Sequence, residues 1–146
     1  MTALVPNTWL SHGTIECMDH AAARRFYQDV LGLGSVRPLP AAQYLWQGGP
    51  WSLVCVGIGV ETKPQTADNR FCLRVDAAEH VDAAHEAALR AQTEHRIREI
   101  GPIEEHDGVR SFVLCDMDCN WWEISNADGT RYDEAFLRGD VSPSAR

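Results

Sequence analysis

The chain reads as two similar halves, and this internal repeat constrains the fold more than any other feature of the sequence. Residues 9–18 alternate between polar and apolar side chains as a half-buried strand does, and residues 70–75 alternate in the same way. A helical pattern and further strand-like segments follow in each half. Such units cannot bury their sheet faces alone, so we expect two repeats, over about residues 9–60 and 70–126, packed side by side. A C-terminal extension over residues 127–146 completes the single domain.

Each predicted helix carries an apolar stripe that would face a sheet. The helices span about residues 19–30 and 78–92, and Asp19 is a favourable N-cap for the first. The stripes recur at helical spacing and consist of Ala23, Phe26 and Val30 in the first helix and Val81, Ala84, Ala88 and Leu89 in the second. His80 and His85 lie beside the second stripe, and we expect both to be solvated.

The composition excludes several classes of function. A net charge of -8 without a cluster of Lys and Arg argues against a surface for nucleic acid or an anionic membrane. No apolar run is long enough to span a membrane and the N-terminus lacks a signal-peptide pattern, so we expect a cytoplasmic protein. The five cysteines are odd in number and lack zinc-site spacing, which predicts reduced thiols. Small molecules and protein partners remain.

The segment DMDCNWWEI, residues 116–124, predicts a hairpin in which an acidic turn leads into the last strand of the repeat. Alternation places Trp121 and Glu123 on one face of that strand and Trp122 and Ile124 on the other. A buried Glu123 needs a hydrogen-bonding, cationic or metal partner, because removing water from a lone charge is very costly. A Glu123 that faces solvent on an edge strand needs none, and the pattern leaves both interpretations open.

Three segments together resemble the vicinal oxygen chelate superfamily, which includes glyoxalase I, extradiol dioxygenases, fosfomycin-resistance transferases and bleomycin-resistance proteins. Residues 12–19, HGTIECMD, look like the family's opening strand, and residues 26–33, FYQDVLGL, look like the end of its first helix. Residues 116–124 look like its closing D-P-D-G-N-x-x-E motif. The likeness covers about residues 10–126 and implies an α+β fold in which two βαβββ modules pair into an eight-stranded curved sheet, or cup. It implies little about the reaction, because this fold serves many chemistries.

In the catalytic members of the family, strands of the paired modules supply ligands to a divalent metal inside the cup. His12 matches the first-strand histidine and Glu123 the closing glutamate, and both side chains suit iron, manganese, zinc or nickel. Arg70 stands where the family has its second histidine, and a guanidinium that stays charged does not ligate a metal. Leu53 stands at a first-module position that sometimes holds Glu or Gln. The resemblance therefore implies a degenerate metal site.

A cup without metal needs another role for its charged residues. Arg70 could pair with Glu123, and Arg74 with Glu16, across neighbouring first strands, because buried charges need partners. The same two arginines could instead hold a carboxylate or phosphate of a ligand. Both roles stay open from the sequence.

Three further features are candidates for a site. Either the aromatic wall of a ligand pocket or ordinary packing explains Tyr44, Trp46, Trp51 and Trp121. His106 lies in a predicted loop, where it is either a proton shuttle or a solvated residue. Cys72 lies between two arginines along its strand, which would lower the pKa of its thiol and favour a role as a nucleophile.

Two functions of different class follow. The first is a small-molecule-binding or sequestering protein whose cup holds an aromatic or anionic ligand, with Arg70 and Arg74 as polar anchors. The second is a metal-dependent lyase, isomerase or dioxygenase in which His12 and Glu123 bind the metal, which acts as a Lewis acid. The resemblance also implies a homodimer, with the cup formed within one chain or across two.

Overall fold

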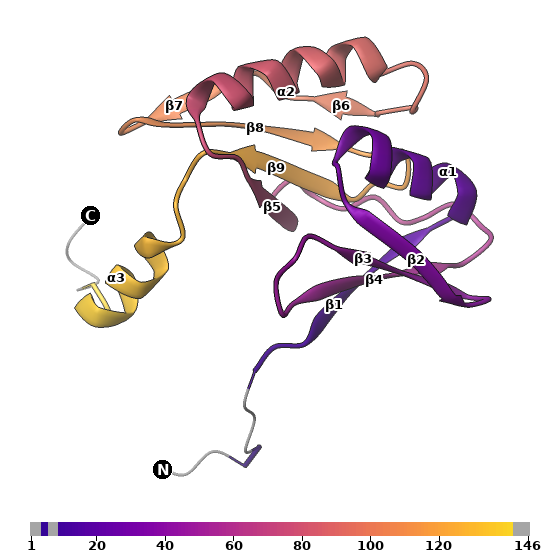
Figure 1. Ribbon diagram of the computed structural model, residues 1–146, viewed down its shortest axis with the longest axis horizontal. Coiled ribbons are helices and arrows are strands. Elements are labelled where there is room, and N and C mark those ends of the chain that lie inside the picture. The colour runs from indigo at the N-terminus through magenta and orange to yellow at the C-terminus, as the bar shows by residue number, and fades with distance from the viewer. Residues whose placement is uncertain (1–3, 6–8, 142–146) are drawn as a thin grey trace.

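The structure, a computed structural model, describes residues 4–5 and 9–141 (Figure 1), so residues 142–146 of the expected extension lie outside the described part. The first module comprises, in chain order, β1 (His12–Cys17), α1 (His20–Arg25), the π-helical turn η1 (Phe26–Val30), β2 (Gly34–Leu39), β3 (Ala42–Trp46) and β4 (Ser52–Gly57). The second comprises β5 (Arg70–Arg74), α2 (Ala78–Ala91), β6 (Glu99–Ile100), β7 (Glu104–His106), β8 (Val109–Cys115) and β9 (Trp121–Ser125). The helix α3 (Thr130–Arg138) follows.

The strands form two sheets with the same underlying pattern. The first sheet has the order β1-β4-β3-β2, and the second has the order β5-β9-β8-β6 with β7 paired to β8. In each module the first strand runs parallel to the last, as β1 does to β4 and β5 does to β9. The predicted α+β fold built from two like modules is confirmed. Backbone hydrogen bonds divide the strands into a four-stranded and a five-stranded sheet, in which β1 and β5 are edge strands.

A single hydrophobic core joins the two modules. The helix α2 covers one face of the second sheet and contacts η1 of the first module (Figure 1). Tyr27 of η1 and Trp122 of β9 are fully buried, and their ring centroids are 5.7 Å apart. Phe71 of β5 packs against Trp122 and also against Trp51, which precedes β4. Aromatic rings from both modules therefore share one interior, as the repeat predicts.

The predicted helical stripes are confirmed except at one residue. Asp19 caps α1, because its carboxylate accepts the backbone N–H of Ala22 at 2.8 Å. The stripe residues that are buried in the core are Ala23, Phe26, Val81 and Ala88. Leu89 is half exposed, so the stripe on α2 is narrower than predicted. Among the described residues, every helix is too short or too polar to cross a membrane.

The prediction that His85 is solvated is wrong. Its ring lies edge-on against Phe112 of β8 with centroids 4.9 Å apart, and its Nε2 is 2.9 Å from the carbonyl oxygen of Gly101. His80, for which the same was predicted, is exposed. Of these two histidines, only His85 therefore belongs to the contact between α2 and its sheet.

The acidic turn between β8 and β9 is held together by Asp116, which is buried. Its carboxylate accepts the backbone N–H groups of Asp118 and Asn120 at 2.9 and 3.0 Å and the indole N–H of Trp122 at 3.0 Å. Burial raises the pKa of Asp116 to about 6, although these hydrogen bonds favour its ionised form. The predicted hairpin is confirmed, and one buried carboxyl group fixes its turn.

Candidate functional site

The two residues that match the family's metal ligands lie in different sheets. His12 begins β1, is exposed, and has Oγ of Ser11 within 3.1 Å of its Nδ1. Glu123 lies at the middle of β9 in the other sheet. Glu123 lines a pocket of about 100 Å³ together with Arg70 and Ser111, and His12 does not line that pocket.

Glu123 has a cationic partner, as its partly buried position requires. Nε of Arg70 donates to Oε2 of Glu123 at 2.7 Å, and the side chain of Glu123 is only 15% exposed. The hydrogen bond to Glu123 raises the pKa of Arg70. The pairing of Arg70 with Glu123 that the sequence suggests is therefore present, and it joins β5 to β9.

A metal ion does not fit this pair within one chain. Among the described residues, no three or more His, Cys, Asp or Glu side chains are arranged to hold a metal. The guanidinium of Arg70 already binds the carboxylate of Glu123 and would repel a cation placed beside it. His12 and Glu123 thus have the chemistry of metal ligands without the arrangement of a metal site.

The expected pair between Arg74 and Glu16 is absent from the structure. Nη1 of Arg74 is instead 3.6 Å from Oδ1 of Asp76, and the side chain of Arg74 is 54% exposed. The expectation placed the two first strands side by side, whereas β1 pairs with β4 and β5 pairs with β9. An exposed ion pair of this length contributes little to stability, so Arg74 can bind a ligand group instead.

Cys72 does not have the lowered thiol pKa that its two arginine neighbours suggest. It lies opposite Glu123 in the register of β5 and β9. Desolvation and then the charge of Glu123 raise the pKa of the Cys72 thiol, and the charges of Arg131 and Arg70 offset only part of this rise. Cys72 is therefore poorly suited to act as a nucleophile. Arg131, in the first turn of α3, is a further cation near Cys72 and Glu123, and no sequence motif predicts its position there.

His106 lies in a short strand and not in the predicted loop. It is the last residue of β7, pairs with Val109 of β8, and is exposed. The structure thus places it at a hairpin end on the second sheet.

The predicted aromatic wall is divided among separate places. Trp121 lies beneath the segment that links the modules, where its indole N–H donates to the carbonyl oxygen of Gln65 at 2.9 Å. Tyr44 is exposed on β3. Trp46 and Trp51 both line a crevice between the modules.

This aromatic crevice has a volume of about 340 Å³ and lies between the hairpin of β3 and β4 and the edge strand β5. Its lining is mainly apolar and includes three tryptophans, a phenylalanine and four leucines: Trp46, Trp51, Trp122, Phe71, Leu33, Leu45, Leu53 and Leu73. Among the described residues that line it, Arg74 is the only charged one. The crevice therefore combines aromatic surface with a single cation.

Local contacts hold the aromatic side chains of the crevice in place. The indole N–H of Trp46 donates to the carbonyl oxygen of Gly49 at 2.8 Å, which ties the ring to its own hairpin. The ring of Trp51 lies over Gly13 of β1, where a Cβ atom would be only 3.2 Å from Cζ2 of Trp51. Trp51 also packs against Phe71 with ring centroids 5.9 Å apart. The crevice is therefore largely formed before any ligand binds.

Comparisons with known proteins find similar folds but no similar sequence family. No protein-family model matches the sequence, and no curated protein matches it. Among solved structures, the oxidase ChaP-H2 matches with a TM-score of 0.64 and 21% identity, over 83% of this chain and 94% of that chain. Lactoylglutathione lyase from Agrobacterium tumefaciens matches with a TM-score of 0.57 and 20% identity, over 83% of this chain and 95% of that chain. The fosfomycin resistance protein FosX from Listeria monocytogenes matches with a TM-score of 0.67 and 16% identity, over 85% and 97%.

These matches extend over most of this chain and nearly all of each solved chain, so they include both modules and not one repeat alone. The three proteins share one superfamily although their activities differ. The chain therefore has the fold of the vicinal oxygen chelate superfamily.

Proposed function

We propose that this protein binds a small aromatic carboxylate in the aromatic crevice. The rings of Trp46, Trp51 and Phe71 offer surfaces for stacked or edge-on contacts with an aromatic ligand. Arg74 can hold the carboxylate by charge-assisted hydrogen bonds. The volume of about 340 Å³ falls within the usual range of small-molecule pockets. The observation that carries the proposal is that one crevice joins aromatic residues of the first module to Arg74 of the second.

This proposal narrows the sequence-based expectation of an aromatic or anionic ligand and moves the site from the cup to the crevice. Arg70 is the weaker anchor, because its Nε already donates to Glu123. A FosX variant from Listeria monocytogenes was solved with Mn(II) and 1S,2S-dihydroxypropylphosphonic acid, so the fold can also hold a small anion. The alternative, a metal-dependent lyase, isomerase or dioxygenase, is supported by the match of His12 and Glu123, which one chain keeps in separate sheets.

Binding of 2-naphthoate tests the proposed function. The parent protein should bind it, and Arg74→Gln should weaken the affinity about tenfold, because the carboxylate loses a charge-assisted hydrogen bond while the rings remain. The neutral analogue 2-naphthamide should bind parent and variant equally. Isothermal titration calorimetry measures all four affinities.

Matched variants complete this test. Arg90→Gln removes the same charge from an exposed pair with Glu86 on α2, and it should leave the affinity for 2-naphthoate unchanged. Trp51→Ala should weaken both compounds, because it removes a ring that each would contact. If the parent binds neither compound, the proposed function is wrong. If Arg74→Gln binds 2-naphthoate as the parent does, Arg74 is not the anchor.

We also propose that the protein forms a homodimer through α3. This helix has no buried residue, and Phe136 and Leu137 are each 89% exposed. Large apolar side chains gathered on one exposed element are typical of a protein contact. Phe136→Glu should convert the dimer to a monomer in size-exclusion chromatography with light scattering. Val60→Glu, at an exposed apolar residue outside α3, should leave the dimer intact, and a monomeric parent would contradict the proposal.

A further inference from the structure

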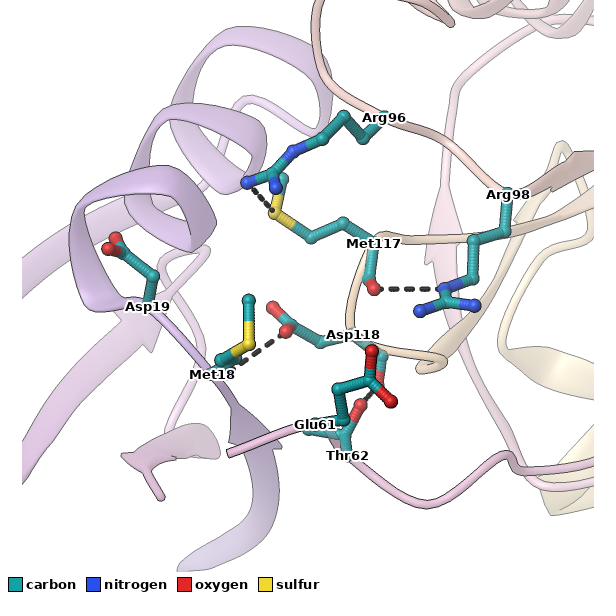
Figure 2. Close-up of a pocket in the computed structure, with 8 residues that line it drawn as sticks. All are labelled: Met18, Asp19, Glu61, Thr62, Arg96, Arg98, Met117 and Asp118. Carbon is teal, nitrogen blue, oxygen red and sulfur yellow. Dashed lines mark hydrogen bonds between the residues drawn. The ribbon is translucent and has the colours of Figure 1, made fainter. Parts of the chain in front are cut away.

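A second cavity between the modules is lined by charged residues of both signs. This charged pocket has a volume of about 260 Å³ (Figure 2). Three carboxylates line it: Asp19 at the start of α1, Glu61 in the linking segment and Asp118 in the turn before β9. Arg96 and Arg98, from the segment between α2 and β6, line it as well. The pocket thus gathers five charges from segments that are far apart in the sequence.

The two arginines have only neutral hydrogen-bond partners among the described residues. Nη2 of Arg96 donates to Sδ of Met117 at 3.5 Å, and Nε of Arg98 donates to the carbonyl oxygen of Met117 at 2.9 Å (Figure 2). A thioether sulfur is a weak acceptor, and each guanidinium has five N–H donors. Neither arginine forms an ion pair with a described carboxylate of the pocket, although Arg70, Arg74 and Arg90 each form one elsewhere and Arg110 forms two. Most of their donors therefore remain available to a ligand.

Asp118 is the most unusual member of the carboxylate wall, because it is only 5% exposed. Its Oδ1 accepts the backbone N–H of Met18 at 2.9 Å, and its Oδ2 has no hydrogen-bond partner among the described residues. The carboxylate lies near the centre of the side chains drawn in Figure 2. Desolvation raises the pKa of Asp118, and the charges of Arg96 and Arg98 oppose that rise. Oδ2 is not one of the fully buried, unpaired polar atoms of the described residues, so it is open to the pocket and can accept from a cationic or N–H donor group.

Ligands with a single charge match only one part of this pocket. An anion near Arg96 and Arg98 would be repelled by Asp118 and Glu61, and a cation near Asp118 would be repelled by the two arginines. A ligand with an ammonium group and a carboxylate satisfies both groups of side chains at once. The thioethers of Met18 and Met117 offer apolar contacts for the chain that joins the two charges.

We infer that the charged pocket binds a small zwitterion, with its ammonium group at Asp118 and Glu61 and its carboxylate at Arg96 and Arg98. This site is separate from the aromatic crevice, with which it shares no lining residue. Both sites lie between the modules, but they take ligands of different charge.

Binding of 4-aminobutanoate and 6-aminohexanoate tests the inference, since they carry the same two charges at different separations. At least one of them should bind about tenfold more tightly than the carboxylate and the amine of the same length, which are butanoate and butylamine or hexanoate and hexylamine. Isothermal titration calorimetry on the full chain gives each affinity. If neither zwitterion binds more tightly than its single-charge analogues, the inference is overturned.

Variants locate the binding. Asp118→Asn keeps an acceptor for the N–H of Met18, and both this variant and Arg98→Gln should weaken the zwitterion about tenfold. Arg96 has a positive φ of 52°, which glycine adopts without strain, so Arg96→Gly should fold well and still bind less tightly. Arg90→Gln and Glu79→Gln, on exposed positions of α2, should bind as the parent does.

The outcome with Arg74→Gln distinguishes the two cavities. That variant should bind the zwitterion with the affinity of the parent, because Arg74 lines only the crevice of the two. Loss of zwitterion binding in Arg74→Gln, with normal binding in Arg98→Gln, would place the ligand in the crevice and overturn the inference.

Discussion

Replacing Trp122 with alanine should lower the free energy of unfolding by about 3–5 kcal/mol, the usual cost of removing a buried large aromatic side chain. Trp122 has no exposed surface, and its ring lies 5.7 Å from the ring centroids of both Tyr27 and Phe71. Its indole N–H also donates to Oδ2 of Asp116 at 3.0 Å. One substitution therefore opens a cavity between the modules and leaves a buried acceptor with one partner fewer.

Trp46→Ala is the matched control for this prediction. Trp46 is 56% exposed, so its removal should cost about 1 kcal/mol or less. Urea denaturation followed by far-ultraviolet circular dichroism compares the two variants without relying on tryptophan fluorescence. Equal losses of stability in the two variants would mean that Trp122 does not hold the modules together.

Asp116→Ala should be the second most damaging change, with a loss of about 3 kcal/mol at pH 7. The substitution removes the acceptor of three N–H groups, and each buried donor left unpaired costs about 1–3 kcal/mol. The alanine variant also avoids the free-energy cost of burying an ionised carboxylate at pH 7, and this offsets part of the loss. A loss below about 1 kcal/mol in urea denaturation would show that the turn does not depend on Asp116.

The difference in stability between the parent and Asp116→Ala should also depend on pH. The pKa of Asp116 is raised from its ordinary value of 3.8 to about 6, so between these values the folded protein holds the proton more tightly than the unfolded chain does. The resulting stability is complete below about pH 4 and is lost as the pH rises through 6, by about 3 kcal/mol in total. Asp116→Ala lacks this contribution, so the gap between parent and variant should widen as the pH falls from about 7 to 4. A constant gap would contradict the raised pKa.

The sequence predicts the fold well where one periodic pattern decides the structure. Alternation alone identifies β1 and β5 and places Trp122 and Glu123 on opposite faces of β9. The pairing of Arg70 with Glu123 is one of the two roles that the sequence leaves open for Arg70, and the structure has it between β5 and β9, which are neighbours within one repeat. These relations depend on residues within a single module.

Relations between the modules are harder to predict. Laying one repeat over the other suggests a contact between Glu16 and Arg74, but each belongs to an edge strand of its own sheet. Strand β2 contains Pro38, which cannot donate a backbone hydrogen bond to a neighbouring strand, and it lies at the outer edge of its sheet, where proline is tolerated. In both cases the result depends on which strands lie at the edge of a sheet, and the periodicity of the sequence does not show which strands these are.

Neither cavity could be predicted from a motif. The aromatic crevice joins Trp46 and Trp51 to Arg74 because a hairpin of one module meets the edge strand of the other. The charged pocket joins Arg98 to Asp118, which belongs to the family-like segment 116–124 but has no role that the resemblance assigns. The residues were visible in the sequence, but their neighbourhood depends on how the modules meet.

Because the two modules share one hydrophobic core, the shapes of the two cavities depend on each other. Each has one wall from the first module and another from the second, and Tyr27 and Trp122 meet between those modules. Any rotation of one half against the other would reshape both cavities at once. If a ligand in one cavity favours a particular rotation, it changes the affinity of the other cavity for its own ligand. Thermodynamic reciprocity then requires that the second ligand change the affinity for the first by the same factor.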